Sequence, residues 1–63
     1  MYLKNLAKLR KEKGLTQEGL ARKATISYHT LIKLETERIK NPSIDTTIKL
    51  ANALEVSLDK LIG

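Results

Sequence analysis

Apolar residues recur at helical spacing along the first part of the chain. Leu3, Leu6 and Leu9 lie three residues apart, which is the periodicity of one face of an α-helix. Lys4, Lys8 and Lys11 fall on the opposite side of such a helix. Gly14 follows, and glycine readily adopts the left-handed conformation that ends many helices. The pattern therefore predicts an amphipathic helix over about residues 2–13.

Two shorter helices are predicted next, and only a short link separates them. Thr16 and Ser27 are residue types that cap helix N-termini, because a side-chain oxygen accepts a bond from a free backbone N–H group. The first of these helices has an apolar stripe made of Leu20, Ala21 and Ala24. We therefore predict helices over about 17–24 and 28–36. A very short turn between two short helices is what a helix-turn-helix motif requires.

The last third of the chain predicts two more helices after a loop that contains Pro42. A helix over about 44–54 follows Ser43 or Asp45 as the N-cap, and a short helix over 58–62 follows Ser57. The apolar side chains that we expect to face the core from these two helices are Ile44, Ile48, Ala51, Leu54, Leu58, Leu61 and Ile62.

These elements define the expected fold class, which is an all-α compact bundle of five short helices in one domain over residues 1–63. The chain has 63 residues, no cysteine and one histidine, so neither disulfides nor a metal site is expected to stabilise it. No strand pattern is present, and no apolar run reaches the ~20 residues of a membrane span. We expect no cofactor, no small-molecule ligand and no membrane contact. A cysteine-free chain also fits a reducing cytoplasm.

Charge is unevenly distributed and indicates a polyanionic partner. The formal net charge is +5, and residues 1–13 alone carry five Lys or Arg against one Glu. Residues 14–40 carry a further excess of two positive charges, whereas residues 41–63 are negative by one. A basic surface of this kind is typical of nucleic-acid binding, although a merely solvated surface remains the alternative.

The predicted helix over 28–36 has an outward face with unusual chemistry. At 100° per residue, Leu31 and Leu34 fall on the side of the core. The side chains that share the other face offer hydrogen-bond donors, acceptors and an apolar group, which are the groups that read base edges in the major groove. These candidate base-reading residues are Tyr28, His29, Ile32 and Lys33. Each of them alone also suits an ordinary exposed helix face, and Ile32 also suits a core or partner contact.

The order and spacing of several short motifs resemble the lambda-repressor-like (Cro/C1-type) helix-turn-helix family over essentially the whole chain. The residues that carry the resemblance are Leu9-Arg10, Gly14-Leu15-Thr16-Gln17-Glu18, Leu20-Ala21, Ser27, Leu31, Leu34-Glu35, Pro42-Ser43 and the run from Leu50 to Asp59. Each motif alone is weak, but together they are specific. The resemblance implies a sequence-specific, double-stranded DNA-binding regulator of transcription, most often a repressor, rather than an enzyme.

The resemblance also implies roles for individual residues. Arg10 and Glu35 match a partly buried salt bridge, and Arg10 also lies where a phosphate contact is found. The other positions that match contacts to the DNA backbone are Gln17, Ser27, Arg38, Lys40 and Ser43. Because one such domain contacts little DNA, we expect a homodimer on a palindromic operator, with half-sites about one helical turn apart.

Three features depart from the family or leave alternatives open. Thr25 stands where the family usually has glycine, so a positive φ angle there would be strained. Exposed Ile32 and Ile39 would suit an antitoxin-type or other protein-interaction module. The residues indicate neither the operator sequence nor the dimer surface, and they do not distinguish repression from activation. The 63 residues fit either a whole regulator or the N-terminal part of a longer one.

Overall fold

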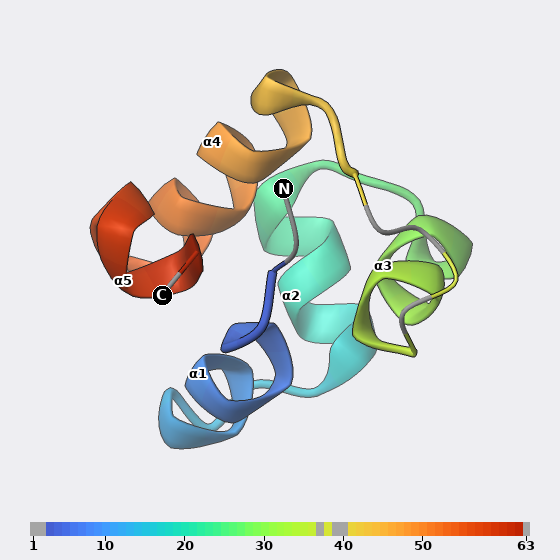
Figure 1. Cartoon of the computed structure of the whole chain (residues 1–63). Helices are drawn as coiled ribbons and strands as arrows, with labels where there is room; N and C mark the ends of the chain where they lie inside the picture. Colours follow the sequence, from blue (N-terminus) through green and yellow to red (C-terminus); the bar gives the residue numbers. More distant parts are fainter. Residues whose placement is uncertain (1–2, 37, 39–40, 63) are drawn as a thin grey trace.

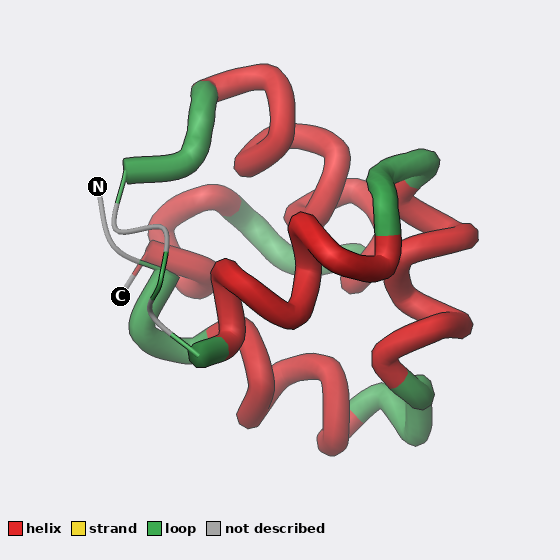
Figure 2. Tube along the Cα trace, turned by 90° about the vertical axis from the view of Figure 1, so that its right-hand side faces the viewer, coloured by secondary structure: helices red, strands yellow, loops and turns green. Residues whose placement is uncertain are grey.

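The computed structural model of the chain describes residues 3–36, 38 and 41–62, and the described residues form helices joined by short loops (Figures 1 and 2). The helices are α1 (Leu6–Glu12), α2 (Gln17–Ala24), α3 (Tyr28–Glu35), α4 (Ile44–Leu54) and α5 (Leu58–Ile62). This is the all-α, five-helix fold that the sequence predicts, with α2 packed against both α3 and α4, and α5 packed against α4.

Side-chain caps set the starts of four helices as predicted. Thr16, Ser27 and Ser43 each accept a hydrogen bond from the backbone N–H three residues later, at 2.9 to 3.1 Å. Ser57 does the same for the N–H of Lys60 at 3.1 Å. Each bond satisfies one of the N–H groups that a helix leaves free at its start. Local sequence therefore determines these boundaries, and it places Ser43 rather than Asp45 at the cap of α4.

The first helix is shorter than the predicted range 2–13, of which Tyr2 lies outside the described residues. Asn5 occupies the N-cap position of α1 but makes no side-chain cap bond. Its amide nitrogen instead donates to the carbonyl oxygen of Lys60 at 3.0 Å, so it holds the start of the domain against α5. Leu3 precedes the helix, yet its side chain is still buried in the core.

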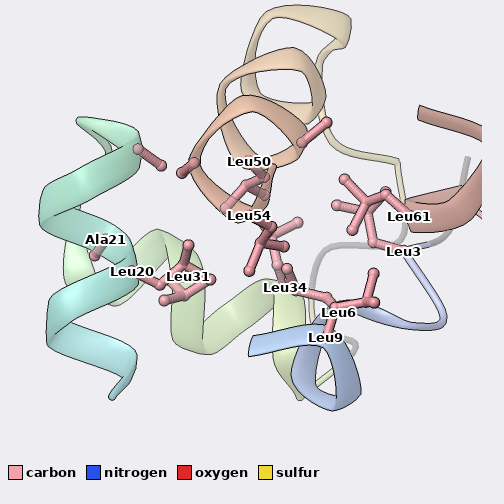
Figure 3. Packing of buried hydrophobic residues seen from close by; sticks show 13 residues of the cluster. Leu3, Leu6, Leu9, Leu20, Ala21, Leu31, Leu34, Leu50, Leu54 and Leu61 are labelled. Carbon is pink, nitrogen blue, oxygen red and sulfur yellow. The ribbon is translucent and has the colours of Figure 1, made fainter. Parts of the chain in front are cut away.

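Leucine dominates the core, to which all five helices contribute (Figure 3). The largest fully buried side chains belong to Leu6, Leu20, Leu31, Leu50, Leu54, Leu61 and Thr47. Ala21 and Ala24 are buried on α2, and Ala51 and Ala53 on α4, where small side chains permit close packing of the helices. Burying a leucine side chain contributes about 1.5–3 kcal/mol, so this cluster supplies the main stabilisation of the fold.

The predicted inward face of α4 and α5 is partly wrong. Ile44 is 58% exposed, Ile48 is 40% exposed and Leu58 is 36% exposed. The buried face of α4 is instead centred on Thr47, Leu50 and Leu54, about a third of a turn away from Ile48. The threonine is tolerated in the core because its hydroxyl donates to the carbonyl oxygen of Ser43 at 2.9 Å. An apolar pattern alone does not reveal that a threonine takes this buried place.

Candidate nucleic-acid interface

The turn between α2 and α3 sets the geometry of the helix-turn-helix. Thr25 ends α2 in the left-handed conformation, with φ 58° and ψ 44°. Its N–H donates to the carbonyl oxygen of Arg22, and the N–H of Ile26 donates to that of Ala21. A helix end closed by this pair of hydrogen bonds usually has glycine at the left-handed position, so a β-branched residue is strained there. The positive φ angle on which the expected strain at Thr25 depends is therefore present.

Ser27 begins α3 and is fully engaged in capping it. Its oxygen accepts from the N–H of Thr30 at 3.0 Å, and its hydroxyl donates to the Thr30 hydroxyl oxygen at 3.1 Å. The predicted contact of Ser27 with the DNA backbone therefore requires that the second of these bonds is exchanged. A threonine three residues after a capping serine is a local signal for this bond, and the predicted site did not include Thr30.

The outer face of α3 presents most of the predicted base-reading residues to solvent. Tyr28 is 40% exposed, and its ring centroid lies 5.9 Å from that of His29, with the two planes tilted by 58°. His29 and Lys33 are exposed as well, whereas Ile32 is half-buried. Leu31 and Leu34 point into the core, as expected from the helical period. The apolar side of α3 thus packs into the core, and the opposite, largely polar side is exposed to solvent.

A hydrogen-bonded network ties this helix to α1 and α2. The Arg10 guanidinium contacts the Glu35 carboxylate through two nitrogens, with Nε–Oε2 at 2.7 Å and Nη2–Oε1 at 3.2 Å. A third nitrogen, Nη1, donates to the carbonyl oxygen of Leu15 at 2.8 Å. The two side chains of this salt bridge are only 11% and 5% exposed. The pair implied by the family resemblance is therefore formed, and it fixes the end of α3 against α1.

Gln17 joins the same network, which the sequence did not indicate. Its amide nitrogen Nε2 donates to Oε1 of Glu35 at 3.0 Å. A glutamine amide has two N–H donors, so one remains for another acceptor. The bond fixes the direction of that second donor at the first turn of α2.

The first turn of α2 adjoins the start of α3. Two open hollows, of about 330 and 360 Å³, share Glu18 and Tyr28 as lining residues. Gln17 lines one of them, and Arg22 lines the other. Glu18 and Arg22 were not among the predicted site residues, because their helical positions gave no sign that they would flank Tyr28.

The structure describes two of the three remaining residues that were predicted to contact the DNA backbone. Arg38 is exposed after the end of α3, and its N–H donates to the carbonyl oxygen of Lys33 at 2.8 Å. Ser43 caps α4, and its hydroxyl donates to that of Thr46 at 2.9 Å. Lys40 lies outside the described residues, as does Ile39 of the proposed protein-contact surface.

Between described residues, ion pairs near this face are few. Within residues 3–36, 38 and 41–62, the ion pairs are Arg10–Glu35 and an exposed contact of 3.5 Å between Lys23 and Glu55. Among these same residues, no three side chains of the metal-binding types gather in one place. No helix in the described part of the chain combines the length and apolar character that crossing a bilayer would need.

Comparison with protein families decides the assignment. Residues 6–61 match the profile of the helix-turn-helix family. The chain is a lambda-repressor-like helix-turn-helix DNA-binding domain. This family consists of transcription regulators and not of enzymes.

Individual relatives of this helix-turn-helix domain are bacterial and phage proteins. It is 45% identical over 58 residues to the uncharacterized HTH-type transcriptional regulator y4dJ of Sinorhizobium fredii, covering 92% of this chain and 74% of y4dJ. It is 40% identical over 55 residues to the immunity repressor protein of Bacillus phage phi105, covering 87% of this chain but only 38% of the repressor.

A solved structure with the same fold contains DNA. The domain is similar to the master regulator for biofilm formation SinR, in its crystal structure in complex with DNA, with a TM-score of 0.92 and 33% identity over the whole of both chains. The five helices of this chain are therefore arranged as in a protein that has been seen bound to DNA.

Proposed function

We propose that this domain binds double-stranded DNA in a sequence-specific manner by placing α3 in the major groove, and that it regulates transcription as a repressor. The observation that carries the proposal is the exposed polar face of α3, which lies beside the first turn of α2. The relatives support it, since one is an immunity repressor and another is a regulator solved with DNA. Its place of action is then the cytoplasmic DNA of a bacterial or phage-infected cell.

Base readout is assigned to the side chains that leave the exposed side of α3. Lys33 donates to guanine O6 and N7, and the Tyr28 hydroxyl and His29 imidazole donate or accept at neighbouring base edges. Ile32 is half-buried, so it contributes an apolar contact with a thymine methyl group from the margin of this face. Each well-formed bidentate contact discriminates against a wrong base by about 1–3 kcal/mol.

Phosphate contacts are assigned to the start of α2 and to the network behind it. Thr16 caps the N–H of Gly19, which leaves the N–H groups of Gln17 and Glu18 in the first turn of α2 to meet a phosphate beside the second amide donor of Gln17. Arg10 has five donors, of which three are used by Glu35 and Leu15, so two remain for a phosphate. Such contacts fix the register of α3 on the duplex without reading sequence.

The loop after α3 and the start of α4 complete the proposed backbone clamp. Arg38 and Lys40 follow the recognition helix, and Ser43 opens α4 with free N–H groups in its first turn. Ser27 contributes once its hydroxyl turns from Thr30 to the backbone of the DNA. Together with α2, these groups contact phosphates on both sides of the groove that α3 enters.

Selection of binding sites from random-sequence DNA tests the readout. We expect one enriched sequence whose binding survives moderate salt, because base contacts depend less on salt than phosphate contacts do. Enrichment of no sequence, together with binding that disappears as salt rises, would show electrostatic association only.

We further propose that the domain binds a palindromic operator as a homodimer. A symmetric dimer places two recognition helices one helical turn apart, about 34–36 Å, and roughly doubles the DNA contact. Ile44 and Ile48 lie one turn apart on α4 with more than a third of each side chain exposed, and apolar surface of this kind favours association.

Stoichiometry on the selected site tests the dimer. We expect two copies of the chain per duplex in analytical ultracentrifugation, and Ile48→Glu should remove the cooperativity of binding while a single half-site is still bound. The matched control Lys49→Gln changes the charge by the same one unit at a neighbouring position and should retain cooperative binding. One copy per full site would refute the dimer.

A further inference from the structure

The lysines of α1 and its flanks are not used by the interface described so far. Lys8 and Lys11 lie on α1, Lys4 precedes it and Lys13 follows it, and all four side chains are exposed. We refer to these four residues as the α1 lysines. Glu12 is the one acidic residue among residues 1–13. A large part of the positive charge of the chain thus belongs to a surface without an assigned partner.

Two of the α1 lysines repel each other. Lys8 and Lys11 are three residues apart on α1, so their like charges lie on one face of the helix. The first turn of α1 has no acidic residue and no side-chain cap to offset this. Within the described residues, none of the α1 lysines makes a salt bridge. A surface that retains repelling charges in this way fits a polyanion better than plain solvent.

The position of α1 next to the proposed phosphate contacts of α2 indicates that this polyanion is DNA. The last turn of α1 leads through Gly14 and Leu15 directly into Thr16 and Gln17, where the phosphate contacts of α2 are proposed. Arg10 on the same helix already contacts Glu35, which also binds Gln17. Figure 1 shows α1 beside the end of α2 at which that helix begins. The α1 lysines are therefore exposed residues on and beside the helix that leads into the proposed phosphate-contacting edge of the domain.

We propose that the α1 lysines contact the phosphate backbone of the DNA that flanks the half-site, beyond the base pairs that α3 reads. The inference rests on the proposed DNA-binding function and deepens it, because it assigns a second, sequence-independent part to the footprint. Lys8 and Lys11 form its centre. Their exposed ammonium groups supply point charges that need no fixed geometry, which suits flanking DNA of any sequence.

The test compares two duplexes that carry the same selected site. The short duplex ends at the outermost base pairs of the site, and the long duplex adds about one helical turn of DNA, 10–10.5 base pairs, at each end. The slope of log K against log salt concentration is measured for the wild type, for Lys8→Gln/Lys11→Gln and for the control Lys49→Gln/Lys60→Gln. Both doubles remove two positive charges, and glutamine retains the helix propensity of lysine.

We expect the α1 double variant to reduce the steepness of the slope only on the long duplex, by about 0.9 for each phosphate that is no longer neutralised and thus by about 1.8 for each bound copy of the chain. The control should match the wild type on both duplexes. Slopes that are unchanged in the α1 double variant, or lowered equally in both doubles, would overturn the inference. Circular dichroism of each variant establishes that the helices are retained.

The short duplex separates this inference from the proposed function. Selective binding of the wild type there, with no effect of added flanks, overturns the role of the α1 lysines and leaves readout by α3 standing. Absence of any site preference on the short duplex overturns the readout itself.

Discussion

At the scale of single residues, two non-glycine residues among those that the structure describes lie in the left-handed region. Thr25 ends α2 and Glu55 ends α4, each with φ 58° and ψ 44°. Both close their helix with the same pair of backbone hydrogen bonds. Left-handed geometry costs an L-residue about 1–2 kcal/mol, so the fold accepts strain at both positions. At Thr25 this strain lies in the turn that orients α3 relative to α2.

Thr25→Gly is therefore expected to stabilise the domain. Relief of the strain exceeds the added flexibility of glycine in the unfolded chain, and the net gain is about 0.5–1 kcal/mol. The melting temperature should rise by about 2–8 °C in a domain of this size. Lys13→Gly is the matched control, because Lys13 is an exposed helix end with φ −85° and has no strain to relieve. A melting temperature that falls in Thr25→Gly, as in the control, would refute the strain.

At the scale of the elements, the salt bridge between Arg10 and Glu35 connects helices that are distant in sequence. Glu35 accepts from Arg10 of α1 and from Gln17 of α2, so one carboxylate joins three helices. Removing one member leaves the other as an unpaired charge in a nearly buried place, which typically costs about 3–5 kcal/mol. A well-packed apolar pair of similar volume costs far less.

Arg10→Met alone is thus expected to destabilise the domain by about 3–5 kcal/mol, which is a large part of the stability of a domain this small. The double variant Arg10→Met/Glu35→Met should recover most of that loss. Urea denaturation of both variants and of the wild type measures the difference. A double variant as unstable as the single one would show that the contribution of Arg10 comes from its other contact, with the Leu15 carbonyl oxygen.

The start of a helix could be predicted from the sequence where the interaction that sets it joins residues close together in the chain. The starts at Thr16, Ser27, Ser43 and Ser57 were predictable because a cap bonds to a group three residues away. The start of α1 was not, because Asn5 bonds to Lys60 at the opposite end of the chain.

The same distinction applies to the candidate site. The exposed face of α3 follows from helical periodicity, since Leu31 and Leu34 fix its orientation. The bond from Gln17 to Glu35 joins positions 18 residues apart, and no local pattern reports it. Ile44 and Ile48 were predicted to be buried for a similar reason. Which face of α4 is buried, and thus the burial of Thr47 in their place, depends on how α4 packs onto α2.

At the scale of the whole molecule, charge and polarity are distributed over different surfaces. The excess of positive charge belongs to residues 1–40, which include α1, α2 and α3, while residues 41–63 are slightly acidic. The exposed apolar side chains Ile44, Ile48 and Leu58 belong to this second part. This division agrees with the proposal that the first three helices make most of the DNA contacts, with Ser43 at the start of α4 adding one, and that the last two helices carry the dimer contact.

The measurement that tests base readout most directly is the ratio of affinities for the selected and a scrambled site, at moderate salt, for Lys33→Gln and the control Lys49→Gln. Both variants lose one exposed lysine, but only Lys33 lies on the outer face of α3. We predict that Lys33→Gln lowers the ratio by about 5- to 150-fold, the equivalent of 1–3 kcal/mol, while the control retains it. An equal, small loss of affinity for both sites in both variants would contradict base readout by α3 and leave only a charged surface that holds DNA.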